Sequence, residues 1–254
     1  MSYLERLPWM LLYQALLPML GYLAIGIPFI LLERKFPAHR VDYRRRLAAD
    51  LGNCAIVFVN GIGISIVVFD GVINRLELWR RFDFTLAIPL WLSLPLVAVG
   101  IDFTLYWLHR ALHSKLLWPI HRWHHAPTEI YWLSGIRASF VQNTLYVLVS
   151  LTWAIALHVP QQLFGLGGLG AALNNDFMHA NWRLRLPWLE RVVVTPRVHL
   201  LHHRKTQTET FNYGAFFSLW DHWFGTWSNP DTAEPVKEFG IDETVNPVRI
   251  VVGV

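Results

Sequence analysis

The sequence predicts an all-α fold: a polytopic membrane helical bundle with about four to five membrane-embedded helical segments, including a hairpin, and a cytoplasmic histidine-rich cap. Three observations predict it. The 254 residues are 54% hydrophobic and only 16% charged, which is not the composition of an ordinary soluble domain. Several apolar stretches have about the length that crosses a bilayer. Nine of the 12 histidines fall in four short clusters near the ends of such stretches.

The expected membrane segments are apolar runs that carry almost no charge. They are Leu11–Leu32, Leu51–Phe69, Leu86–Ile101 and the two arms of a hairpin within about Phe140–Leu173. Pro160 separates the two arms, because proline lacks a backbone donor and disfavours helix at the residue before it. The first run is long and has no small-residue cleavage pattern, so we expect a transmembrane helix and not a cleaved leader.

Basic residues set the expected orientation. Six of them crowd the connection between the first and second spans: Arg34, Lys35, Arg40, Arg44, Arg45 and Arg46. By the positive-inside rule this connection lies in the cytoplasm, and counting spans from it places all four histidine clusters at the cytoplasmic edge. Basic clusters beside membrane spans favour contact with anionic lipid, so we expect no nucleic-acid partner.

Two segments share the spacing H-x-x-H-H. They are HRWHHAP, with His121, His124 and His125, and HLLHH, with His199, His202 and His203. If each segment is helical, its first and third histidines lie one turn apart and its second lies three residues after the first. The spacing therefore predicts that the three imidazoles of a box can converge.

Two shorter clusters repeat the arrangement. Asp102, His109 and His113 stand at i, i+7 and i+11, and therefore share one narrow face of a helix. Asn175 and His179 stand at i and i+4. With the two boxes, these clusters supply nine candidate metal-ligating histidines.

The number and spacing of the histidines predict two metal ions. One H-x-x-H-H pattern should arise by chance roughly 0.03 times in a chain of this histidine content, so two of them favour metal ligation over ordinary core histidines. Eight or nine imidazoles exceed what one ion can hold. Neutral imidazole suits zinc, copper, iron and nickel, and the lone Cys54 supplies no thiolate cluster.

A zinc hydrolase is the first alternative enzyme. Such enzymes normally set a carboxylate beside the ligands, as in H-E-x-x-H, and neither box contains a glutamate. Asp102 and Asp176 share helical segments with histidines, and we expect each to orient a ligand by hydrogen bonding and not to act as a general base. A pair of redox metals therefore fits the sequence better.

Five segments make the chain resemble the membrane fatty acid hydroxylase and sterol desaturase superfamily. They are DFTLYWLHRALH, LWPIHRWHHAP, NNDFMHANW, TPRVHLLHH and NYGAFFSLWDHWFGTW, within about Val97–Trp227. The resemblance implies one membrane-embedded domain over 1–254. In it, transmembrane helices over 1–96 precede a catalytic region at 97–227, and a C-terminal tail covers 228–254.

The resemblance also implies a chemistry. In that family a non-haem di-iron centre held by histidines activates O₂ and hydroxylates or desaturates a C–H bond of a lipid. Carried over, the iron ligands are His109, His113, His121, His124, His125, His179, His199, His202 and His203. Asn175 occupies a position where related proteins have His or Asn, which implies a water-mediated role. Zinc is expected as a substitute for iron in purified protein.

The partners and the location follow from the same resemblance. It implies a membrane lipid substrate, whether fatty acyl, sterol- or hopanoid-like, or an ether lipid. Because the sequence contains no haem-attachment motif and no fused carrier segment, we expect an external electron donor, ferredoxin- or cytochrome b5-like, with its reductase. The expected location is the bacterial inner membrane.

The alternative from another class is a non-catalytic metal-binding protein or a metal or proton transporter, since ionisable residues within membranes mark such pathways. A transporter predicts histidines spread through the depth of the spans, whereas these cluster at span ends on one side.

Some other features of the sequence resemble functional sites, but we do not assign a function to them. GLGGLG at Gly165–Gly170 matches the dinucleotide pattern G-x-G-x-x-G, but no strand precedes it, so we expect helix packing by small residues and no nicotinamide or flavin site. We expect His39 and His158 to be structural, and we do not include His222 among the ligands.

Overall fold

Every regular element that the structure describes is a helix. The computed structural model describes residues 13, 16–68, 71, 88–157, 159–160, 163–205 and 210–243. Its helices are α2 (Leu17–Ile25), α3 (Ile27–Lys35), α4 (Tyr43–Ile66), α6 (Leu90–Leu112), α7 (Trp118–His125), the 3₁₀ helix η3 (Trp132–Ile136), α8 (Phe140–Ala156), α9 (Phe164–His179), α10 (Pro196–His202) and α11 (Leu219–Trp223). In these residues β-pairing is limited to isolated bridges. The all-α prediction is confirmed.

Three helical stretches in the described part of the chain are long and apolar enough to cross a membrane. They are Leu17–Lys35, Tyr43–Ile66 and Leu90–Leu112, and α8 is a shorter apolar helix. Large apolar side chains point outward from the three stretches: Leu31 is 62% exposed, Val59 49% and Trp91 75%. An outward apolar surface of this kind suits contact with lipid, and the predicted polytopic membrane bundle is confirmed.

The first span is broken at its centre. Gly26 separates α2 from α3, and Pro28 lacks the N–H that would continue the helical ladder across the break. The indole of Trp132 lies against Gly26 so closely that a Cβ at this position would overlap the ring. The absence of a side chain at Gly26 therefore lets η3 approach the middle of the first span.

The second and third spans extend beyond their apolar runs. Helix α4 begins at Tyr43, where the Asp42 carboxylate accepts a hydrogen bond from the Arg45 backbone N–H at 3.3 Å. Helix α6 continues to Leu112, which places His109 in its last turn. The apolar run marks only the part of a helix that meets lipid, and polar residues continue the helix past it.

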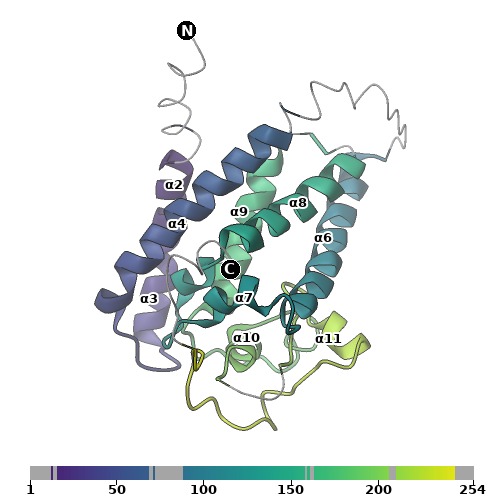
Figure 1. Ribbon diagram of the computed structural model, residues 1–254. Coiled ribbons are helices and arrows are strands. Elements are labelled where there is room, and N and C mark those ends of the chain that lie inside the picture. The colour runs from purple at the N-terminus through teal and green to yellow at the C-terminus, as the bar shows by residue number, and fades with distance from the viewer. Residues whose placement is uncertain are drawn as a thin grey trace.

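The helices bring the histidine-bearing segments to one end of the bundle. Figure 1 shows α7, α10 and α11 gathered at the end where α3 leads into α4. Of the two hairpin arms, α8 packs on α4 and α6, whereas α9 packs on η3 and α10. The expected loop at Asp70–Phe84 lies almost wholly outside the described residues, and so does His158.

A buried carboxylate joins three separate segments at this end. Glu33 of α3 is completely buried and accepts hydrogen bonds from the backbone N–H groups of Trp132 and Asn181, both at 2.7 Å, and from the Tyr43 hydroxyl at 3.2 Å. It therefore ties the first span to η3 and to the chain that follows α9.

Asp50 of α4 makes a second bridge of the same kind. It is completely buried, accepts a hydrogen bond from the Tyr131 hydroxyl at 2.6 Å, and forms an ion pair with Arg137. Both acceptors fix the segment between α7 and α8, which lies beside the histidines.

We predict that Glu33→Ala destabilises the protein. The substitution leaves two buried backbone N–H groups without an acceptor, at about 1–3 kcal/mol each. For a chain of this size the apparent unfolding midpoint in detergent should fall by about 5–15 °C. Glu234→Ala is the control, because Glu234 is exposed. Equal midpoints for the two variants would contradict the bridging role of Glu33.

Candidate metal centre

All nine predicted ligand histidines come together, and they form two groups. The five-histidine group contains His109, His113, His121, His125 and His202. The four-histidine group contains His124, His179, His199 and His203. Within each group one nitrogen of every ring lies within 4.8 Å of the others, and neither group, among the described residues, includes a carboxylate or a thiol.

Each H-x-x-H-H box is divided between the two groups, in opposite senses. The first and third histidines of the HRWHHAP box join the five-histidine group, and the middle one, His124, joins the four-histidine group. In the HLLHH box the middle one, His202, joins the five-histidine group and its neighbours join the four-histidine group. Residues i and i+4 differ by only about 40° around a helix, whereas i+3 projects about 60° to the other side of i. The expectation that all three rings of a box converge is therefore wrong.

Hydrogen bonds fix the tautomer of five of the nine rings. The Nδ1 atoms of His109, His124, His179 and His202 lie 2.6–3.0 Å from backbone carbonyl oxygens, and that of His121 lies 3.0 Å from the Gln142 Oε1. A carbonyl oxygen can only accept, so each of these Nδ1 atoms carries the proton. The Nε2 atom of each ring is then an unprotonated lone pair available to a metal.

The five-histidine group leaves its lone pairs without partners. All five Nε2 atoms are buried and have no hydrogen-bond partner in the protein. Five unsatisfied buried nitrogens in one place, of which those of His109, His121 and His202 are lone pairs, would be costly unless a cation lies among them. The donor set therefore fits a metal ion.

The geometry of the four-histidine group also fits a metal ion. Four of the six pairs of Nε2 atoms in this group lie 3.0–3.2 Å apart. Tetrahedral ligands at about 2.0–2.1 Å from a metal would stand about 3.3–3.4 Å apart. His124 and His179 carry their protons on Nδ1, so their Nε2 lone pairs, 3.2 Å apart, repel each other unless a cation separates them.

Burial keeps the imidazoles neutral. Desolvation lowers the pKa of His124 to about 4 and that of His202 to about 3, against hydrogen bonds that act to raise both. Burial and the neighbouring rings lower the pKa values of His121, His125 and His199 well below the usual range. Neutral imidazole is the form that binds metal, so near pH 7 these side chains are ready ligands.

The two aspartates expected beside the ligands have other partners. Asp102 accepts hydrogen bonds from the backbone N–H groups of Phe216 and Phe217 and from the Trp220 indole, at 2.7–3.1 Å. It shares a face of α6 with His109 but stands about 10 Å away along the helix axis, which is too far for direct contact. Asp176 accepts a hydrogen bond from the Tyr22 hydroxyl at 2.5 Å. Both carboxylates join helices to other segments.

Asn175 stands beside the four-histidine group. Its backbone carbonyl accepts the His179 Nδ1 proton at 2.7 Å. Gly135 of η3 packs against both residues: a Cβ there would overlap the His179 ring and lie 2.8 Å from the Asn175 Nδ2. Gly135 and Gln142 were not expected from the sequence, although an amide side chain within an apolar run is a signal for Gln142.

The features set aside lie outside both groups. His39 packs on Phe239 with ring centroids 5.0 Å apart, and the exposed His222 stacks on Trp227 at 4.3 Å. GLGGLG lies within α9, and a Cβ at Gly167 would meet nothing within 4 Å. The same holds at Gly168 and Gly170, so the expected packing of these glycines on a neighbouring helix is absent from the described chain.

These features define a class: a helical membrane protein with two adjoining, all-histidine groups whose donor atoms suit a metal ion. Residues 94–226, just over half of the chain, match the fatty acid hydroxylase family. The chain belongs to this family, and it is an integral membrane protein. The match covers every one of the nine histidines.

Named relatives act on lipids. An alkylglycerol monooxygenase of Xenopus tropicalis is 30% identical over 156 residues, which cover 59% of this chain and 33% of that protein. An ornithine lipid hydroxylase of Rhizobium tropici is 30% identical over 144 residues, covering 56% and 44%. A Δ7-sterol 5(6)-desaturase of Aspergillus fumigatus is 27% identical over 158 residues, covering 60% and 42%. The matched part of the chain thus spans less than half of each relative. No solved structure matches the chain significantly.

We predict that His124→Ala and His202→Ala each lower the bound metal by about one ion per chain, because the two residues belong to different groups. Elemental mass spectrometry of protein purified without oxygen measures the loss. His222→Ala should keep the full metal content, since its ring lies outside both groups. Unchanged metal in both box variants would refute the assignment of the ligands.

Proposed function

We propose that this protein is an O₂-dependent oxidase of membrane lipids whose two histidine groups hold two iron ions. It hydroxylates or desaturates a C–H bond of a fatty acyl, sterol- or hopanoid-like, or ether lipid. The observation that carries the proposal is the pair of groups itself: nine histidines, buried or nearly so, with no carboxylate among them. The named relatives, a monooxygenase, a hydroxylase and a desaturase, support the same chemistry.

The donor set supports a redox metal pair over a hydrolytic zinc site. A zinc hydrolase needs a general base beside its metal, and the nearest predicted carboxylates are engaged elsewhere. Iron is favoured among the metals that accept imidazole by the family to which the chain belongs. When bound, the iron pair would supply the activation of O₂ and the oxidation of the C–H bond. Zinc is expected as a substitute in protein purified in air.

The chain's own residues prepare the site for this reaction. Carbonyl oxygens and Gln142 hold the rings so that the Nε2 lone pairs converge before any metal arrives. Burial removes water from around the ligands, which limits side reactions of activated oxygen. The indole of Trp118 packs against His113 and His125, with centroids 5.4 Å from each, and closes one side of the five-histidine group.

The position of the site argues against a transporter. A transport pathway would place ionisable ligands through the depth of the spans. Both groups instead lie at one end of the bundle, beside the basic α3–α4 connection (Figure 1). By the positive-inside rule we place this end in the cytoplasm, with the bundle in a bacterial inner membrane.

Both reactions need two electrons from outside. Hydroxylation consumes one O₂, two electrons and two protons for each alcohol and water formed, and desaturation consumes the same for one alkene and two waters. We propose an acidic ferredoxin- or cytochrome b5-like carrier, with its reductase, as the donor.

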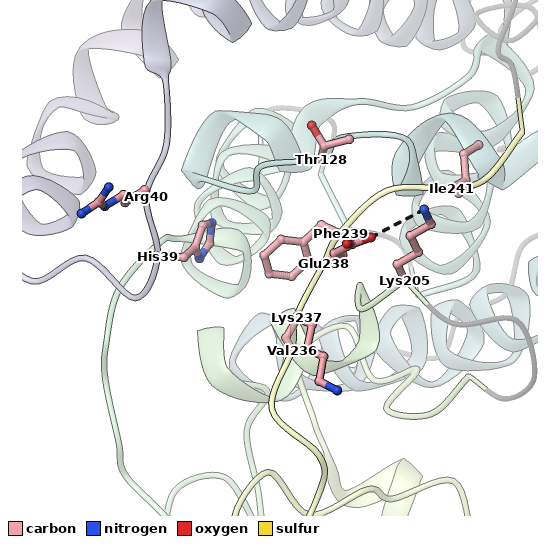
Figure 2. Close-up of a pocket in the computed structure, with 9 residues that line it drawn as sticks. All are labelled: His39, Arg40, Thr128, Lys205, Val236, Lys237, Glu238, Phe239 and Ile241. Carbon is pink, nitrogen blue, oxygen red and sulfur yellow. Dashed lines mark ion pairs between the residues drawn. The ribbon is translucent and has the colours of Figure 1, made fainter.

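A basic surface pocket suits the docking of this carrier. Figure 2 shows the pocket, with a volume of about 350 Å³, lined by His39, Arg40, Lys205 and Lys237 among others. Lys205 follows the ligand His203 by two residues, so their Cα atoms are at most about 8 Å apart. Lys205 itself pairs with Glu238 and Asp242, which leaves Arg40 and Lys237 as the cations we assign to the carrier.

We predict that cells producing the protein contain a lipid with one added oxygen or two fewer hydrogens, absent from cells producing His202→Ala at the same level. Lipid mass spectrometry compares the two, and growth under ¹⁸O₂ labels a hydroxyl product. Identical lipids in both strains, from protein that carries iron, would contradict the proposal and favour a non-catalytic metal-binding protein.

We predict that Arg40→Glu combined with Lys237→Glu slows turnover by about tenfold at low salt when a ferredoxin and its reductase supply electrons. With dithionite as reductant the variant should match the wild type, because a small reductant needs no docking. Raised ionic strength should slow the wild type only with the carrier. Arg191→Glu, an exposed basic residue outside the pocket, is the control. Equal slowing with both reductants would exclude docking at this pocket.

A further inference from the structure

The two histidine groups are held by different parts of the chain. In the five-histidine group, the carbonyl oxygen of Phe211 accepts from His202 at 2.6 Å and that of Tyr213 accepts from His109 at 2.8 Å. In the four-histidine group the accepting carbonyls belong to Arg137 and Asn175. The segment Phe211–Gly214 thus supports two ligands of one group and supplies neither carbonyl to the other.

Asp221 of α11 fixes this segment. Its carboxylate is completely buried and accepts hydrogen bonds from the backbone N–H groups of Tyr213 at 2.8 Å and Gly214 at 2.9 Å, and from the Thr226 hydroxyl at 2.7 Å. Gly214 has to be glycine, because a Cβ would meet the Phe217 carbonyl oxygen at 2.6 Å. The position of the Tyr213 carbonyl therefore depends on a side chain that touches no histidine ligand.

Asn212 fixes the same segment from its other side. It has a left-handed backbone, with φ of 60°, which asparagine tolerates better than most residues. Its N–H donates to the Thr226 carbonyl at 2.9 Å, and its side chain accepts from the Ser228 N–H at 2.8 Å and donates to the Ser228 carbonyl at 3.1 Å. Its two neighbours in the chain are the residues whose carbonyls reach His202 and His109.

We propose that Asn212 and Asp221 are positioning residues for the five-histidine group alone, so that this group can lose its metal while the four-histidine group keeps its own. The proposal rests on the proposed two-metal centre. The reason is local: if Tyr213 or Phe211 moves, His109 or His202 loses the acceptor of its Nδ1 proton, and its ring is free to turn. Removing such a support typically weakens metal binding by about 10- to 100-fold.

The test uses the full-length protein in detergent, stripped of metal and titrated with Co²⁺, whose visible absorption is stronger in a four-coordinate site than in a five-coordinate one. The wild type should bind two ions. Asp221→Asn puts an amide N–H₂ where one backbone N–H needs an acceptor, and it should weaken one site by about 10- to 100-fold. The site that keeps its affinity should have the strong, four-coordinate absorption.

Gly135→Ala is the reciprocal variant, because its Cβ would displace His179 of the four-histidine group. Gly135→Ala should leave the Co²⁺ affinity of the weakly absorbing, five-histidine site unchanged and weaken Co²⁺ binding at the four-histidine site. Asp231→Asn is the matched control: Asp231 pairs with Arg185 and Arg197 and touches no histidine, so both sites should remain.

Asn212→Gly is a second positioning variant, should Asp221→Asn fail to fold. Glycine keeps the left-handed backbone and loses only the side-chain bonds to Ser228 and a long one, of 3.5 Å, to the Val198 carbonyl. It should weaken the same site as Asp221→Asn, to a smaller extent. Equal weakening of both sites in either variant, or unchanged affinity in both, would overturn the proposal. A wild type that binds no Co²⁺ would instead refute the proposed metal centre.

Discussion

Nine imidazoles have to share one buried volume with their lone pairs turned inward, and the rest of the structure depends on this requirement. The Nε2 lone pairs of His124 and His179, 3.2 Å apart, repel each other, and burial deprives them of water. The protein holds the rings in this arrangement by hydrogen bonds: at least five of them donate their Nδ1 proton to an acceptor with a fixed position. Because those acceptors lie on four different segments of the chain, the centre can form only when the whole histidine-bearing end of the bundle is assembled.

Buried carboxylates serve that assembly by holding neighbouring segments together. Glu33, Asp50 and Asp102 each accept hydrogen bonds from segments far away in the sequence. Asp221 accepts from the nearby Tyr213 and Gly214, and none of the four belongs to a histidine group. A carboxylate can accept several hydrogen bonds at once, so it satisfies backbone N–H groups that no helix or strand would pair. In an apolar, helical protein Glu33, Asp102 and Asp221 replace part of the backbone hydrogen bonding that a sheet would provide.

The two histidine groups are unequal, because each H-x-x-H-H box is divided between them. One group has five histidines, two of them supported by the segment after α10, and the other has four, two of them supported by α9 and the chain before α8. Each box contributes to both groups, so α7 and α10 cannot move without disturbing both. The two proposed metal sites thus share the helices that carry their histidines and differ in the carbonyl oxygens that orient the rings.

The sequence by itself determined the fold class, the end of the bundle that carries the site and all nine members of the two groups, because helical period and hydropathy are local properties that can be read from residue types. Only the tertiary structure decided how those nine divide, since the division depends on which rings meet across α6, α7, α9 and α10. It also decided what orients them. Asp102 and Asp176 were reasonable expectations on their helices, yet carbonyl oxygens of Tyr213, Phe211 and Arg137 do much of this work. Every residue has a carbonyl oxygen, so residue type cannot reveal which ones will face a ligand; only the folded path of the backbone does.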